Sequence, residues 1–164
     1  MMPRSAKLLL IGGLALAIWG MSYGLWYAVF AEHQQLERIG GALATSFAES
    51  AERNPPGAQV ALEEYRATKY VYERHVDVHS HWIGLAMVLI VLAFAFDRVG
   101  LEERMRYWLA LALLVGAVVF PLGVLLQAVV YGAVTKGIAV AGSALVIGSL
   151  AGTAYGLWRE RPAK

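Results

Sequence analysis

The chain has 164 residues, of which 59% are hydrophobic and 16% are charged, and its net charge is +2. A soluble domain of this length carries about a quarter charged residues, so the composition does not suit an ordinary soluble protein. The small net charge, without a basic stripe, argues against nucleic acid as a partner. The absence of cysteine excludes disulfides, thiolate metal sites, iron–sulfur clusters and covalently attached haem.

The apolar residues are concentrated in four blocks, and a helix needs about 20 residues to cross the hydrocarbon core of a bilayer. The first block continues well beyond the apolar core of a signal peptide, so we interpret it as an uncleaved signal anchor. The blocks cover residues 7–31, 81–96, 107–131 and 138–158, and the second extends slightly further at its outer end. The sequence therefore predicts an all-α fold, a four-helix transmembrane bundle in a lipid bilayer.

The segment between the first two blocks is the longest polar part of the chain. Apolar residues recur in its first part at helical spacing, at Leu36, Ile39, Leu43 and Phe47. The run Asn-Pro-Pro-Gly at 54–57 breaks this pattern, and a second helical pattern follows it. We therefore expect a helical hairpin. The predicted parts are the N-terminus with transmembrane helix one (1–31), an extracytoplasmic hairpin (32–80), and transmembrane helices two to four with the C-terminus (81–164).

Basic residues near the ends of the blocks predict the orientation, because Lys and Arg stay on the cytoplasmic side. With both termini in the cytoplasm, the inner flanks carry Arg4, Lys7, Arg98, Arg104, Arg106, Arg159, Arg161 and Lys164. The aromatic residues expected at the outer interface are Trp26, Tyr27, Phe30, Trp82 and Tyr131. The sequence thus predicts a multi-pass protein of a bacterial inner (cytoplasmic) membrane, with its hairpin outside.

The blocks contain almost no ionisable residues, which argues against an ion pump or an ion-coupled transporter. The fourth block has Gly148, Gly152 and Gly156 at four-residue spacing, and small residues so spaced allow a close helix contact. The contact can lie within the bundle, against a cofactor, or against another molecule. We expect a membrane protein partner or a homo-oligomer, and no nucleic acid.

All four histidines lie near the predicted outer face of the membrane. His33 follows the first block, and His75, His79 and His81 precede or open the second. On a helix His75 and His79 lie about 40° apart and share a face. One hypothesis is therefore a copper or zinc site formed by this pair, with His33 as a third ligand.

A second hypothesis gives His79 or His81 the role of an axial ligand to haem b. Asp77 lies four residues before His81 and is placed to accept its second ring proton. Gly84 removes bulk from the same face, where a porphyrin needs room. A third interpretation needs no cofactor, because histidines at a membrane interface also serve as polar groups near water.

The segment HSHWIGL at 79–85 resembles the HxH opening of a helix in small bacterial membrane proteins distantly similar to haem–copper oxidase subunit I. The segment FPLG at 120–123, followed by Gln127, resembles a pattern in the third span of the same proteins. The resemblance implies a haem role for His79 or His81.

These observations predict an integral membrane protein that binds haem or a metal and acts in electron transfer or as an accessory subunit of a respiratory membrane complex. The alternative is a structural or interaction protein without a cofactor, whose hairpin and glycine strips bind partners. The sequence shows no evident nucleophile–base set, so it leaves open whether the protein is an enzyme.

Overall fold

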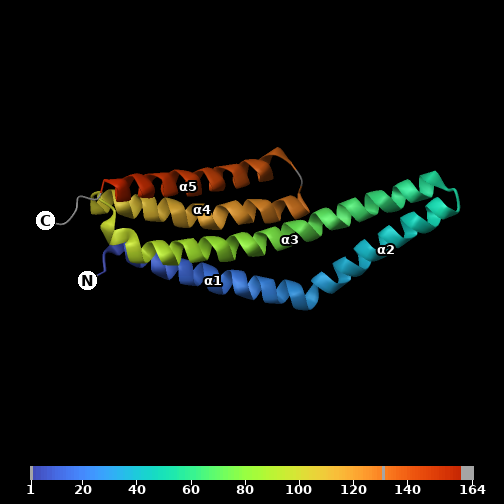
Figure 1. Ribbon diagram of the computed structural model, residues 1–164, viewed down its shortest axis with the longest axis horizontal. Coiled ribbons are helices and arrows are strands. Elements are labelled where there is room, and N and C mark those ends of the chain that lie inside the picture. Colours follow the sequence, from blue (N-terminus) through green and yellow to red (C-terminus); the bar gives the residue numbers. More distant parts are fainter. Residues whose placement is uncertain (1, 131, 160–164) are drawn as a thin grey trace.

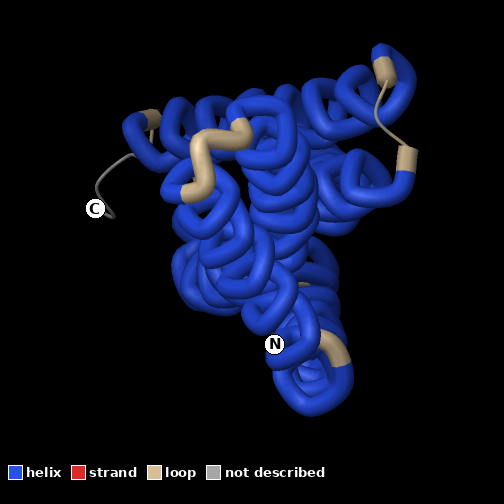
Figure 2. The backbone as a smooth tube through the Cα atoms, turned by 90° about the vertical axis from the view of Figure 1, so that its right-hand side faces the viewer, coloured by secondary structure: helices blue, strands red, loops and turns tan. Residues whose placement is uncertain are grey.

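The computed structural model describes residues 2–130 and 132–159. Tyr131, Arg161 and Lys164, which entered the prediction of orientation, lie outside the described residues. The described chain consists of helices joined by short loops, as Figure 2 shows, and this confirms the all-α prediction. The elements are α1 (Arg4–Phe30), α2 (Glu32–Ala51), α3 (Pro55–Ala95), the short 3-10 helix η1 (Phe96–Arg98), α4 (Glu103–Val129) and α5 (Ala133–Trp158).

Four helices are long and apolar enough to cross a membrane, namely α1, α3 with η1, α4 and α5, as predicted. They form a bundle in which α1, α3 and α4 contact one another and α5 packs mainly on α4 (Figure 1). The transmembrane part of α3 and the second arm of the hairpin are one continuous helix of 41 residues, about 60 Å long at 1.5 Å per residue. The hairpin is thus a direct extension of the bundle.

The hairpin consists of α2 and the first half of α3, which extend beyond the ends of α4 and α5 (Figure 1). The chain leaves α1 at Ala31, whose φ of −126° is not helical, and α2 starts immediately afterwards. The two arms pack closely through Ala42 and Ala61, which are both buried. Ser46 adds a hydrogen bond of 3.2 Å from its hydroxyl to the Ala58 carbonyl.

The start of α3 follows from the sequence of its first turn. The side chain of Asn54 accepts a hydrogen bond from the Gly57 N–H, which has no partner within the helix. Pro55 and Pro56 follow the cap, where their missing N–H groups are not needed and their fixed φ suits a helix. Arg53 completes the turn in the left-handed region, with φ of 58°.

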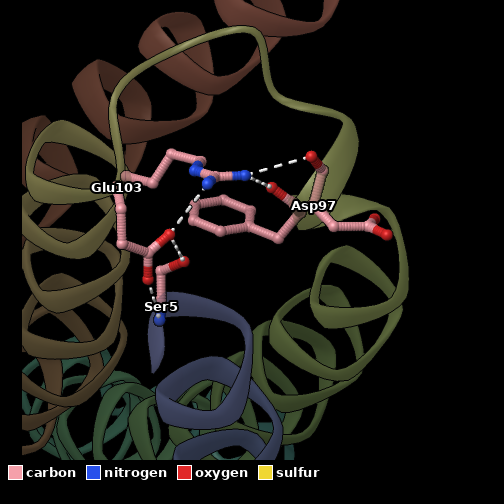
Figure 3. A network of polar contacts seen from close by, with 5 residues as sticks. Ser5, Asp97 and Glu103 are labelled. Atoms are coloured by element: carbon pink, nitrogen blue, oxygen red, sulfur yellow. Dashed lines mark hydrogen bonds and ion pairs between the residues drawn. The ribbon is translucent and has the colours of Figure 1, made fainter. Parts of the chain in front are cut away.

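The start of α1, the end of α5 and the connection between α3 and α4 lie at the other end of the bundle, which we call the terminal end (Figure 1). There Glu103 of α4 accepts hydrogen bonds from the Ser5 backbone N–H at 3.0 Å and the Ser5 hydroxyl at 3.2 Å (Figure 3). Arg106 forms an ion pair with the Glu103 carboxylate at 3.0 Å and donates a hydrogen bond to the Asp97 carbonyl, also at 3.0 Å. Glu103 therefore caps the first turn of α1, and its charge also suits the positive end of that helix.

The close helix contacts differ from the predicted glycine strip on α5. A Cβ atom added at Gly148 would meet no other part of the described chain, whereas one at Gly152 would lie 2.8 Å from Leu109. The closest approach of two backbones joins α4 to α5, where a Cβ atom at Gly142 would overlap the Phe120 nitrogen and one at Gly123 would stand 2.5 Å from the Ala139 nitrogen. The strip is thus only partly used for packing within the bundle.

Candidate functional site

The candidate site begins where α3 enters the bundle beside the last turns of α1. His75 of α3 is stacked on Tyr27 of α1, with ring centroids 4.8 Å apart and planes 11° apart. Its Nδ1 shares a hydrogen bond of 2.5 Å with the Tyr23 hydroxyl. His75 therefore joins α3 to α1 through stacked contacts with Tyr27 and Tyr23 and through one interhelical hydrogen bond.

His79, one turn further along α3, also faces α1. Its Nδ1 lies 3.0 Å from the carbonyl oxygen of Gly20 and, because a carbonyl only accepts, Nδ1 carries the proton and donates it. The ring occupies the space in which a Cβ atom at Gly24 would stand. His75 and His79 thus share one face of α3, as predicted, and that face is directed at α1.

Gly20 and Gly24 form a notch in α1 that receives α3. A Cβ atom at Gly20 would lie 3.2 Å from the Trp82 Cβ atom. The buried Trp82 ring meets Tyr23 edge to face, with centroids 5.2 Å apart. We call Tyr23, Tyr27, His75, His79 and Trp82 the α1–α3 cluster.

His81 lies on the opposite side of α3 and faces α4, where its ring is 4.7 Å from that of Phe120. Gly84 leaves open space beside this position within the described structure, as the haem hypothesis requires, but the space is at the surface of the bundle. The expected bond from Asp77 to His81 is not formed. Asp77 pairs instead with Arg74 at 3.4 Å, since a charged guanidinium three residues away is a stronger partner than an imidazole.

The structure does not bring His33 to the other histidines. It lies on α2 with 82% of its side chain exposed and pairs with Glu37, four residues along the same helix, at 3.0 Å. Among the described residues no group of three or more His, Asp or Glu side chains is placed to hold a metal ion. The predicted three-ligand site of His33, His75 and His79 is therefore not assembled.

A groove of about 360 Å³ opens between α1 and α4, next to the α1–α3 cluster. Its lining is apolar and includes Gly12, Leu16, Trp19, Trp82, Leu114 and Val118. None of the lining residues is a histidine, so a flat ring in this groove would lie against Trp19 and Trp82 rather than on a ligating nitrogen. Gln127, which belongs to the sequence resemblance, donates to the Gly123 carbonyl of its own helix at 3.2 Å.

The sequence did not predict that the residues of the α1–α3 cluster lie together. Tyr23 is a polar residue inside an apolar block, and Gly20 and Gly24 have the four-residue spacing of a close helix contact. These were the available signals. They indicate that some helix approaches α1 at this level, but they do not say that it is α3 or that His79 fills the notch.

The second candidate surface lies on the hairpin. No charged residue occurs between Arg38 and Glu49, so ten residues of α2, 39–48, are uncharged. The side of α2 turned away from α3 is exposed: Phe47 is 69% and Leu36 46% accessible. We call the part of this side between Arg38 and Glu49, with Gly40, Gly41, Ala44, Phe47 and Ala48, the uncharged face of α2. The other arm also exposes Val60 near its tip, but between residues 63 and 73 five of its six exposed residues are charged: Glu63, Glu64, Arg66, Lys69 and Glu73.

Two glycines in the middle of α2 have no use inside the described chain. Each glycine in a helix interior costs about 1 kcal/mol relative to alanine. A Cβ atom added at Gly40 or Gly41 would meet open space in the structure described here. The absence of a side chain at these positions therefore serves neither a turn nor a contact between the two arms.

Comparison with known proteins finds no family, no curated protein and no solved structure that matches this chain.

Proposed function

We propose that this protein is a membrane-anchored interaction protein, in which the four-helix bundle holds the hairpin in a fixed direction and the uncharged face of α2 binds a protein partner. The uncharged face carries the proposal. Exposed helix surfaces in water are normally polar, and an exposed apolar patch indicates a binding surface. The second arm of the same hairpin carries exposed charges from Glu63 to Glu73, whereas α2 has none from 39 to 48.

The continuity of α3 supports this role. One helix passes from the bundle into the hairpin without a break, so the hairpin is held in direction by the packed helices. The α1–α3 cluster strengthens the point where the two parts meet, because interhelical hydrogen bonds and stacked rings fix the approach of α1 to α3. In this proposal the histidines are packing groups.

We further propose that the membrane is a bacterial inner membrane, with the terminal end in the cytoplasm and the hairpin outside. The support is the distribution of basic residues. Arg4, Lys7, Arg98, Arg104 and Arg106 all lie at the terminal end, and short flanks rich in Lys and Arg remain in the cytoplasm.

The test is photo-crosslinking in native membranes. A photoreactive amino acid at Ala44, on the uncharged face, is expected to give a covalent adduct with a protein. The same amino acid at Glu64, exposed on α3, is the matched control and should give none. If neither position gives an adduct, the proposal is rejected.

A second candidate function, binding of haem or of copper or zinc, is favoured by one observation. The Nδ1–H of His79 is held by a backbone carbonyl, which is how ligating histidines are usually oriented, and this leaves Nε2 with its lone pair. Its ring, however, fills the notch at Gly24, and the nearby apolar groove has no histidine in its lining. Packing between α1 and α3 is therefore the better supported role for His79, and partner binding by the hairpin the better supported function.

Metal analysis separates this candidate from the first. A copper or zinc site on α3 predicts stoichiometric metal in the purified protein and its loss in the double variant His75→Ala, His79→Ala. His33→Ala is the control, because His33 lies apart from the pair. A protein free of metal, prepared from cells supplied with copper and zinc, would reject the metal site.

A further inference from the structure

We infer that the partner of the uncharged face of α2 is a second copy of this chain, in a parallel, two-fold symmetric dimer. The inference rests on the proposed function and names the partner. Three observations carry it: the position of the face relative to the bundle, the limits of its uncharged stretch, and the two unused glycines.

Lipid does not cover this face if the bundle stands in the membrane. The hairpin extends beyond the ends of α4 and α5, and α2 leads away from the end of α1 (Figure 1). Phe47 is the sixteenth residue of α2, about 24 Å along the helix at 1.5 Å per residue. The apolar residues in the second half of α2 therefore lie in water, and a protein surface is what removes them from it.

The charge pattern favours an identical partner. A bilayer holds two copies in the same orientation, so a dimer has its two-fold axis along the membrane normal and the same faces of α2 meet side by side. Each residue near such an axis faces its own counterpart, and a charged residue there would meet a like charge. The ten residues between Arg38 and Glu49 carry no charge, so none of them would meet a like charge across the axis.

The glycines favour close approach of two helices. Gly40, Ala44 and Ala48 form a row with four-residue spacing, and Gly41 lies beside it. Small residues in such a row let two helix backbones approach, while Phe47 at the edge supplies apolar area. The α2 helix of a second copy would fill the open space beside Gly40 and Gly41.

Disulfide crosslinking of two differently tagged copies tests the inference, and the chain has no cysteine of its own to interfere. Oxidation of membranes that contain both copies of the Ala44→Cys variant should give a disulfide dimer with both tags. Glu64→Cys is the control and should remain monomeric. Adding Gly40→Leu to Ala44→Cys should reduce the yield of dimer about fivefold or more. Leucine is a better helix former than glycine, so the helical circular dichroism of this variant should be unchanged.

The outcomes separate this inference from the proposed function. A dimer with both tags at Ala44, absent at Glu64 and reduced by Gly40→Leu, supports the inference. Equal crosslinking at Ala44 and Glu64 indicates random collision and overturns it. A photo-adduct at Ala44 with a different protein, without any dimer carrying both tags, overturns the inference and keeps the proposed function. No adduct of any kind overturns both.

Discussion

The imidazole ring of His79 lies where a side chain at Gly24 would stand, and its Nδ1 donates to the Gly20 carbonyl one turn away at 3.0 Å. A histidine on one helix and a glycine on the next are thus complementary in shape. The same contact pairs a polar group with a backbone acceptor at the point where α1 and α3 meet.

Gly24→Ala should therefore weaken the bundle. The added methyl group forces the His79 ring out of the notch and breaks its hydrogen bond, and overpacking of this kind costs about 1–3 kcal/mol. The free energy of unfolding in detergent measures the effect. Gly84→Ala is the matched control, because open space surrounds that position in the described structure. Equal stability of the two variants would contradict the notch.

The Tyr23–His75 hydrogen bond should make a small, specific contribution to stability. Interhelical hydrogen bonds in membrane proteins average about 0.6 kcal/mol, so we expect Tyr23→Phe to reduce the free energy of unfolding by about that amount. A double-mutant cycle with His75→Ala isolates the coupling between the two residues. Tyr155→Phe, an exposed tyrosine on α5, is the control. Additive effects of Tyr23→Phe and His75→Ala would show that the bond contributes nothing.

Glu103→Gln should destabilise the terminal end by about 1 kcal/mol. The neutral amide loses the ion pair with Arg106 and weakens the cap on Ser5, where hydrogen bonds to a charged acceptor are the stronger ones. Thermal unfolding in detergent measures the change. Glu102→Gln is a suitable control, since Glu102 is exposed and its side chain caps nothing. If both variants unfold at the temperature of the parent protein, Glu103 is not a cap that contributes to stability.

Single cysteines can determine the orientation of the chain. Ala58→Cys, at the tip of the hairpin, should react with a membrane-impermeant maleimide in intact cells. Glu102→Cys, between η1 and α4 at the terminal end, should react only after the cells are made permeable. The reverse pattern would place the hairpin in the cytoplasm.

The sequence predicted the spans because a run of apolar residues is a local signal. It also predicted the break between the two arms at 54–57. The second arm begins inside this run, at Pro55, because proline can start a helix but not continue one. It did not show that this arm and the second span are one helix. The residues change from polar to apolar near Ser80, and this change alone does not say whether a helix ends there or continues.

The partners of the site residues were harder to predict, because they depend on which helices become neighbours. Asp77 has Arg74 three residues before it and His81 four residues after it, and helical spacing alone allows either pair. Gly24 of α1 receives His79 of α3, whereas Gly123 of α4 meets α5, and no local sequence pattern distinguishes these two contacts.

The absorption spectrum of the purified protein tests the central claim about the site most directly, namely that its histidines pack helices and do not bind haem. The protein should come from cells supplied with haem. We expect no Soret band, together with a loss of stability in His79→Ala, because that change removes the interhelical hydrogen bond. A Soret band that shifts on reduction and is lost in His79→Ala or His81→Ala would contradict the claim and establish a haem-binding protein.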